Sequence, residues 1–225
     1  DEPAYFAGFA YNIDGSADEI RYAYGSFITP MTMYSYNFKT KKRKVLKQQE
    51  VVGNYDKKEY ISKRIYAISR DGKKIPISLV YKKNIYKKNG KLLLDGYGSY
   101  GYNNDPYFSP ATLSLLNRGF CYAIAHIRGG KIYGESWYED GKMLNKKNTF
   151  NDFIDSAKYL IDKKYTTKNH LYAEGASAGG LLMGAVLNDS SNLFNGIIAG
   201  VPFVDVVNTM LDDTIPLTTG EYDEW

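Results

Sequence analysis

The stretch L-Y-A-E-G-A-S-A-G-G-L-L-M-G-A-V, residues 171–186, decides the fold. A short apolar run ends at Glu174, small residues surround Ser177, and a second apolar run begins. The segment G-A-S-A-G, residues 175–179, matches the pattern G-x-S-x-G between a strand and a helix, which is the context that this pattern requires. Small neighbours are needed at such a turn, because larger side chains would collide with the helix and the adjacent strand. The pattern therefore predicts a sharp turn that exposes the Ser177 hydroxyl.

Outward from this turn, apolar strands alternate with helices. Residues 149–164 have apolar side chains at the spacing of one helical face, and Thr149 with Asp152 resembles a capping box at the start of that helix. The alternation predicts a mostly parallel sheet with both faces covered, as in an α/β fold. The expected strands are K-L-L-L-D (91–95), G-F-C-Y-A-I-A-H-I (119–127), H-L-Y-A-E (170–174) and N-G-I-I-A-G-V (195–201).

The first part of the chain has a different pattern. From about residue 19 to 81, aromatic and β-branched residues alternate with polar ones, which predicts antiparallel strands. The tetrapeptide R-D-G-K, residues 70–73, indicates a hairpin turn between the last two of these strands.

Composition excludes several classes of protein. The net charge of +4 is modest, and lysine clusters at 39–44 and 81–91 are more typical of solvated turns than of a nucleic-acid site. The single cysteine, Cys121, lies in an apolar stretch, which fits a reducing compartment such as the cytoplasm. The start D-E-P-A-Y is no signal peptide, and no apolar run approaches the ~20 residues of a membrane span. We expect no metal and no cofactor.

A second glycine motif imitates a nucleotide site. G-Y-G-S-Y-G, residues 96–101, matches G-x-G-x-x-G and follows an expected strand. A dinucleotide site also needs a helix that starts there and an acidic residue about 20 positions later. The proline- and asparagine-rich segment 102–110 predicts a loop instead, and no acidic residue lies between Asp105 and Glu135.

A nucleophilic serine needs a base, usually a histidine oriented by a carboxylate. His170 precedes the strand that ends at Ser177, and seven residues at ~3.3 Å each place it on the order of 20 Å away. His126 follows another strand at the same sheet edge, but in α/β-hydrolases the histidine follows the nucleophile along the chain. We therefore expect His126 to be structural and the base to lie outside this sequence.

Longer segments point to a family. They are L-L-D-G-Y-G-S-Y-G (93–101), F-C-Y-A-I-A-H-I-R-G-G (120–130), W-Y-E-D-G-K (137–142), N-K-K-N-T-F-N-D-F (145–153), G-A-S-A-G-G-L-L-M-G (175–184) and the run from V-P-F-V-D to D-E-W (201–225). In these segments the chain resembles the prolyl oligopeptidase family of serine peptidases, and within it the branch that cleaves after basic residues. The resemblance implies a β-propeller that caps an α/β-hydrolase domain. Residues 1–60 would be the last propeller strands and the return linker, and residues 61–225 the first half of the hydrolase domain. The catalytic Asp and His would lie beyond residue 225, which would make the chain a fragment.

The resemblance also implies catalytic roles. Ser177 matches the nucleophile. Tyr97 matches the tyrosine whose hydroxyl binds the oxyanion together with the amide of the residue after the nucleophile, here Ala178. A helix N-terminus is a natural place for such an amide donor.

Substrate-binding roles follow from the same resemblance. Glu221 matches the carboxylate that binds an Arg or Lys side chain, Asp223 a second acid there, and Asp105 an acid that contacts the preceding substrate residue. The segment G-E-Y-D-E-W, residues 220–225, alone would indicate only a solvated acidic turn. Tyr107 stands where the family usually has a further acid. The resemblance therefore does not extend to a preference for substrates with paired basic residues.

Two other positions depart from the family pattern. Ala176 replaces the commoner glycine before the serine, and Asp95 replaces a common tyrosine.

The leading hypothesis is a serine endopeptidase that cleaves short basic peptides after Arg or Lys, completed by the remainder of the same protein. Two alternatives stay open. One is a catalytically incomplete fragment or one piece of a split enzyme, and the other is an esterase on the same scaffold.

Overall fold

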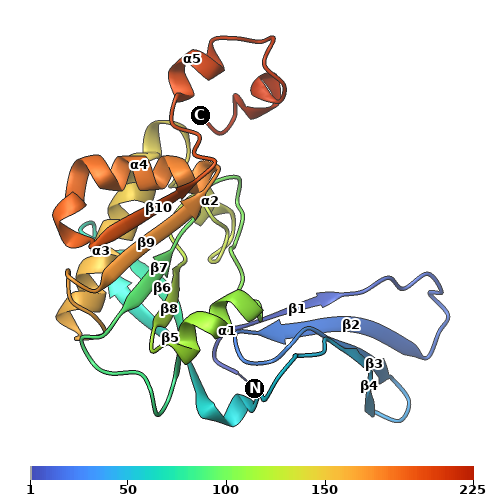
Figure 1. Ribbon diagram of the computed structural model, residues 1–225. Coiled ribbons are helices and arrows are strands. Elements are labelled where there is room, and N and C mark those ends of the chain that lie inside the picture. The colour runs from blue at the N-terminus through green and yellow to red at the C-terminus, as the bar shows by residue number, and fades with distance from the viewer. Residues whose placement is uncertain (1) are drawn as a thin grey trace.

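The computed structural model describes residues 2–225 and contains two β-sheets (Figure 1). Four antiparallel strands in the order β1-β2-β3-β4 form an arm that extends from the body of the molecule. Six strands in the order β10-β9-β7-β8-β6-β5 form the sheet of the body, which also carries the helices.

The arm is built from β1 (Tyr5–Phe9), β2 (Glu19–Ser26), β3 (Thr32–Asn37) and β4 (Arg43–Gln48). Alternating aromatic residues face one another across the strands. Tyr22 stacks on Tyr34 with ring centroids 5.3 Å apart, and the Arg43 guanidinium lies 4.6 Å from the centroid of the Tyr34 ring. The predicted antiparallel strands are confirmed for the arm, and β1 is an additional strand that the alternation did not indicate.

The sheet of the body joins an antiparallel hairpin to four parallel strands. β5 (Tyr60–Ile68) and β6 (Lys74–Lys82) form the hairpin across residues 70–73, as R-D-G-K predicts. β7 (Leu92–Asp95), β8 (Cys121–Ala125), β9 (Leu171–Ala176) and β10 (Gly196–Gly200) run parallel to one another. The predicted mostly parallel sheet is therefore confirmed. After β7 the chain continues as a loop to Pro110, so the predicted loop at the decoy glycine motif is also confirmed.

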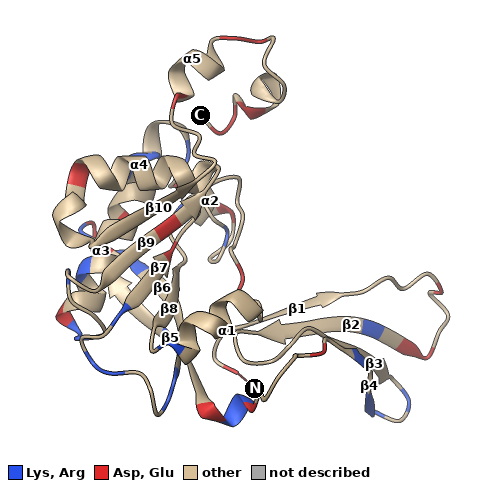
Figure 2. Ribbon diagram, viewed as in Figure 1, with Lys and Arg blue, Asp and Glu red and all other residues tan. Residues whose placement is uncertain are grey.

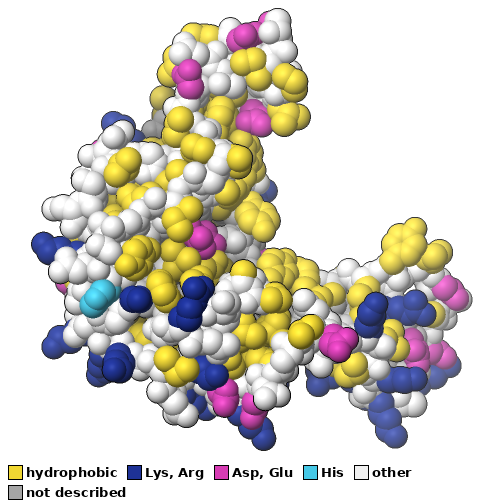
Figure 3. Space-filling view, in the orientation of Figure 1, with side chains coloured by type: hydrophobic (Ala, Val, Ile, Leu, Met, Phe, Trp, Pro, Cys, Tyr) yellow, Lys and Arg dark blue, Asp and Glu magenta, His cyan; other side chains and the backbone are white. Residues whose placement is uncertain are grey.

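Helices α3 (Lys147–Asp162) and α4 (Ala178–Ser190) pack on one face of this sheet, and α1 (Pro110–Asn117) packs on the other beside β6 and β8. The core on the first side includes Phe153 and Leu160 of α3 and Leu182 of α4, all almost fully buried. On the second side Ile198 of β10 stays 56% exposed. Apolar side chains also gather over the visible face of the body, around an acidic side chain (Figure 3). Two short helices, α2 (Glu135–Glu139) and α5 (Val206–Met210), lie in connecting segments.

The predicted capping box of the 149–164 helix is wrong. α3 begins at Lys147, and its N-cap, Lys146, makes no side-chain capping bond. Thr149 therefore lies inside the first turn, and its hydroxyl lies 2.9 Å from the carbonyl oxygen of Arg128. Asp152 pairs with the Arg128 guanidinium. A buried cation needs a carboxylate partner, and this tertiary requirement overrides the local capping pattern.

Arg128 ties three parts of the body together. Its side chain is 2% exposed and lies 2.6 Å from Asp152 of α3 and 2.6 Å from Asp71 in the β5–β6 turn. Its guanidinium carbon lies 5.8 Å from the centroid of the Trp137 ring. The hairpin, the segment after β8 and α3 are thus fixed relative to one another.

Candidate active site

Ser177 occupies the sharp turn between β9 and α4. It is exposed, with φ 56° and ψ −117°, a conformation that non-glycine residues rarely adopt. Backbone hydrogen bonds hold this conformation. The Ser177 amide donates to the Gly200 carbonyl at 2.9 Å, and its own carbonyl accepts from the amides of Gly180 at 2.9 Å and Phe203 at 3.0 Å. The geometry predicted from the glycine-flanked serine is therefore present.

The surrounding glycines leave no room for side chains. A Cβ on Gly175 would lie 2.3 Å from the carbonyl oxygen of Gly179, and one on Gly179 would lie 2.7 Å from that of Gly96. A Cβ on Gly180 would lie 2.5 Å from the Cα of Pro202. Such contacts are far inside van der Waals distance, so β9, α4 and the loop after β7 approach this closely only with glycine at these positions.

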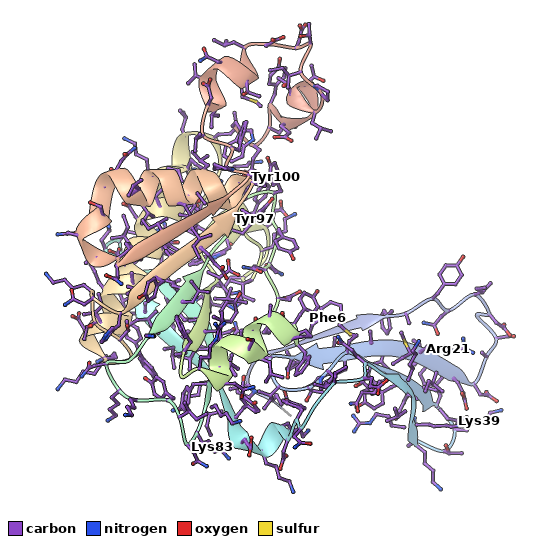
Figure 4. All side chains as sticks on the ribbon, in the orientation of Figure 1. Phe6, Arg21, Lys39, Lys83, Tyr97 and Tyr100 are labelled. Atoms are coloured by element: carbon purple, nitrogen blue, oxygen red, sulfur yellow. The ribbon has the colours of Figure 1, made fainter. Side chains whose placement is uncertain are left out.

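Two candidate oxyanion donors, the Ala178 amide and the Tyr97 hydroxyl, belong to segments that meet at the serine turn. Ala178 is the first residue of α4, where the amides of a helix lack partners within the helix and its dipole favours an anion. Tyr97 lies half-buried in the loop after β7 (Figure 4). Burial raises the pKa of Tyr97, and the neighbouring Ser177 side chain opposes that shift. The phenol therefore stays protonated near neutral pH, as an oxyanion donor must.

Glu221 is held in place by two aromatic residues. The Tyr100 hydroxyl donates to Glu221 Oε2 at 2.7 Å, and the Trp225 indole N–H donates to the same oxygen at 3.0 Å. The Trp225 ring also packs on Phe203, whose amide binds the Ser177 carbonyl. Contacts thus connect the acidic segment to the serine turn. Sequence reasoning missed Tyr100 and Trp225 as partners of Glu221, although both lie in segments that carried the family resemblance.

The other two predicted acids have different surroundings. Asp223 is exposed, in a segment from 201 to 225 that contains several acidic residues and neither lysine nor arginine (Figure 2). Asp105 is half-buried in the loop before α1; burial raises its pKa, and the charge of Arg64 opposes that shift. Tyr107, at the unusual position of the family pattern, packs on Phe6 of β1 with ring centroids 5.2 Å apart.

Both histidines of the chain are engaged away from Ser177. His126 Nε2 lies 2.7 Å from the Ser78 hydroxyl of β6, and burial lowers the pKa of this 5% exposed side chain to about 3. His170 directly precedes β9, at the end opposite to Ser177, and its Nδ1 lies 2.9 Å from the carbonyl oxygen of Asn89. Neither is placed to accept the serine proton.

Two carboxyl groups, those of Asp95 and Glu174, lie opposite each other on the neighbouring strands β7 and β9. Asp95 at the end of β7 pairs in the sheet with Glu174 of β9, and the hydroxyl of Tyr122 donates to Asp95 at 2.6 Å. Burial raises the pKa of Asp95. Burial, followed by the charge of Asp95, raises the pKa of Glu174 to about 7. Asp95 stands where the family commonly has a tyrosine. A phenol is still present there, because Tyr122 of the neighbouring strand β8 donates its hydroxyl to the Asp95 carboxyl.

The architecture and this site match known proteins. A family model described as the prolyl oligopeptidase family matches residues 106–225. The chain belongs to the prolyl oligopeptidase family. A second model, the N-terminal β-propeller domain of prolyl oligopeptidase, matches residues 2–49. The predicted family is thereby confirmed, as is the fold of propeller strands followed by an α/β-hydrolase sheet. The domain boundary near residue 60 stays a prediction.

Individual members of the prolyl oligopeptidase family are similar over the whole chain. Dipeptidyl aminopeptidase BI of Pseudoxanthomonas mexicana is 53% identical over 228 residues, which are 100% of this chain and 31% of that protein. Protease 2 of Moraxella lacunata is 46% identical over 100% of this chain and 33% of its own length. The structure of oligopeptidase B from Leishmania major superposes with a TM-score of 0.94 at 45% identity, over 100% of this chain and 32% of that one. The chain thus spans about a third of the length of these relatives.

Two other kinds of feature are absent from residues 2–225, a metal-binding cluster and a membrane-spanning helix. No group of three or more His, Cys, Asp or Glu side chains in this range is arranged to hold a metal ion. No helix in the same range combines the length and the hydropathy that a membrane span requires.

Proposed function

We propose that this chain carries the nucleophile, the oxyanion site and the cation-binding acids of a serine peptidase that cleaves short peptides after Arg or Lys. The observation that supports this most is the strained, exposed turn at Ser177. Strained backbone conformations cluster at active sites. Membership of a peptidase family agrees with this proposal.

The chemistry follows from the donors around the serine. Ser177 Oγ attacks the scissile carbonyl carbon while a base takes its proton, and the negative oxygen is stabilised by the Ala178 amide and the Tyr97 hydroxyl. The tetrahedral intermediate expels the amine, which receives the proton, and leaves an acyl-enzyme that water hydrolyses. Since both histidines of the chain are engaged elsewhere, we propose that the base and its orienting carboxylate come from the remainder of a longer protein.

Recognition of a basic residue is assigned to Glu221 and Asp223. Both aromatic donors of Glu221 bind Oε2, and among residues 2–225 no donor binds Oε1. Oε1 can therefore accept a charge-assisted hydrogen bond from a substrate guanidinium or ammonium group. Asp105 is proposed to face the preceding substrate residue. Because Tyr107 replaces a second acid there, we propose that this subsite does not require a basic residue.

A second candidate activity is release of dipeptides from a free N-terminus. The 53% identity to dipeptidyl aminopeptidase BI favours it. The two activities share Ser177 and differ in whether the substrate amine must be free. A fluorogenic Arg dipeptide with a blocked N-terminus distinguishes them, because an endopeptidase cleaves it and a strict dipeptidyl aminopeptidase does not.

The deciding experiment uses the full-length peptidase that contains this chain. We expect cleavage of a blocked Arg peptide, and covalent labelling by a fluorophosphonate, to be lost in Ser177→Ala and retained in Ser191→Ala, which changes another exposed serine. Equal labelling and turnover in Ser177→Ala would contradict the assignment. The isolated chain should not turn over substrate, because a serine without its base loses most of its catalytic power.

Short basic peptides and the remainder of the same protein are therefore the proposed partners. The buried, unpaired Cys121 fits a reducing compartment, and the cytoplasm is the proposed location.

A further inference from the structure

Lys146 has no role in the chemistry above, yet it lies between two loops of the candidate site. Its side chain is 12% exposed and its ammonium group contacts three acceptors. Nζ lies 2.8 Å from the Gly98 carbonyl oxygen, 2.5 Å from Ser99 Oγ and 3.2 Å from Glu224 Oε1. An ammonium group has three N–H donors, so this lysine is fully used.

The first two acceptors belong to the loop after β7. Gly98 and Ser99 lie between Tyr97, the proposed oxyanion donor, and Tyr100, which donates to Glu221. Lys146 therefore holds the backbone of the loop that carries both tyrosines.

The third acceptor belongs to the acidic segment. The Glu224 side chain is 3% exposed, its Oε2 accepts from the Tyr138 hydroxyl at 2.8 Å, and its carbonyl accepts from the Met143 amide at 2.9 Å. Glu224 lies three residues after Glu221, and Nζ of Lys146 lies 4.6 Å from the centroid of the neighbouring Trp225 ring. The cation thus also holds the segment that presents Glu221.

We propose that Lys146 is a positioning residue for specificity: its ammonium fixes the distance between the oxyanion loop and the segment of Glu221. This inference rests on the proposed function. A single substrate residue must place its carbonyl at Tyr97 and the end of its basic side chain at Glu221. The separation of the two loops therefore determines whether a cationic side chain and the scissile carbonyl fit together. Burial lowers the pKa of Lys146, and the Glu224 carboxylate opposes that shift.

The test uses the full-length peptidase and two blocked fluorogenic substrates that differ only in arginine against citrulline, its uncharged isostere, at the cleavage site. In Lys146→Met we expect KM for the arginine substrate to rise about tenfold, since a displaced Glu221 loses its charge-assisted contact with the substrate, and the preference for arginine over citrulline to fall about as much. We expect kcat to change much less than KM. Lys146→Arg keeps the charge and should restore part of the preference. Lys158→Met, at an exposed position of α3, should match the wild type.

A second variant covers the case in which Lys146→Met does not fold. Lys146→Met/Glu224→Gln removes both buried charges, so no unpaired charge remains, and it should fold yet still lose the preference for arginine. A folded double variant with wild-type KM and wild-type preference overturns the proposal. So does an equal loss of activity on both substrates, which is what a merely structural role produces.

Hydrogen exchange separates this inference from the proposed function. Amides of residues 97–101 and 218–225 should both exchange faster in the Lys146 variants and not in Lys158→Met. Faster exchange in only one segment, or in neither, overturns the inference. If the wild-type peptidase does not cleave arginine substrates, the proposed function fails, and the exchange result alone decides whether Lys146 ties the two segments.

Discussion

Replacing Arg128 by methionine is the sharpest test of how the body of the molecule is held together. Arg128 is 2% exposed, and its partner Asp152 has a side chain that is 0% exposed. Arg128→Met keeps a long apolar side chain but leaves Asp152 buried without a cation. Removal of one partner of a buried ion pair costs about 3–5 kcal/mol, because an uncompensated charge stays buried. Domains have a net free energy of unfolding of only about 5–15 kcal/mol, so this loss is a large share of it.

Urea unfolding followed by tryptophan fluorescence measures the effect, because Trp137 lies beside the guanidinium. Arg128→Met/Asp152→Asn removes the stranded charge and should recover most of the loss. The control is Lys39→Met, whose lysine pairs with Asp18 at 2.6 Å in an ion pair with side chains that are 75% and 50% exposed. Exposed pairs contribute about 0–1 kcal/mol, so this control should lose little. The reasoning is refuted if Arg128→Met loses no more than Lys39→Met, or if the double variant is no more stable than Arg128→Met.

Three further predictions concern the site. Tyr97→Phe should lower kcat by about 10²–10³ with little change in KM, since an oxyanion donor acts in the transition state; steady-state kinetics with an unchanged kcat would contradict its role. Gly175→Ala should lower the free energy of unfolding by an overpacking penalty of about 1–3 kcal/mol, and with it the thermal unfolding midpoint, because its Cβ would lie 2.3 Å from the Gly179 carbonyl oxygen; an unchanged midpoint would contradict the described turn. The pKa of Glu174 is raised in the folded state, from 4.5 to about 7, so its carboxyl stabilises the fold below pH 4.5 and loses that contribution as pH rises through 7. Glu174→Gln should therefore be neutral in stability at pH 4 and stabilising at pH 8, and the same change in urea midpoint at both pH values would argue against a raised pKa.

Local patterns sufficed to predict the turn at Ser177 and most of the strands. The tight turn at Ser177 requires small residues within a few positions on both sides. This requirement is local, so it can be recognised in the sequence alone. The hairpin at 70–73 and the buried strand at Cys121 are local in the same sense, and both are confirmed. The first strand, β1, escaped prediction because Y-F-A-G-F is short and its partner β2 begins ten residues after it ends.

Contacts between distant segments could not be predicted in this way. The bond from Tyr100 to Glu221 joins residues 121 positions apart, and that from Lys146 to Glu224 joins residues 78 positions apart. Asp152 shows the opposite failure, since a local capping pattern was present and a tertiary ion pair with Arg128 prevailed. The roles of Glu221 and Asp223 came from family resemblance, because an isolated acidic turn does not indicate its ligand.

The stacking of Tyr107 on Phe6 has a consequence for how the protein can be divided. Tyr107 lies two residues from Asp105, and its ring is backed by a residue of the arm. A body produced alone, from residue 60 onward, would keep the serine turn. It would lose Phe6, and with it the ring that packs on Tyr107. Its tyrosine would face water and be free to change rotamer. If Asp105 contacts the substrate as proposed, truncation should alter the side chains accepted beside Asp105 before it alters the chemistry, and the arm then supports that subsite through Phe6.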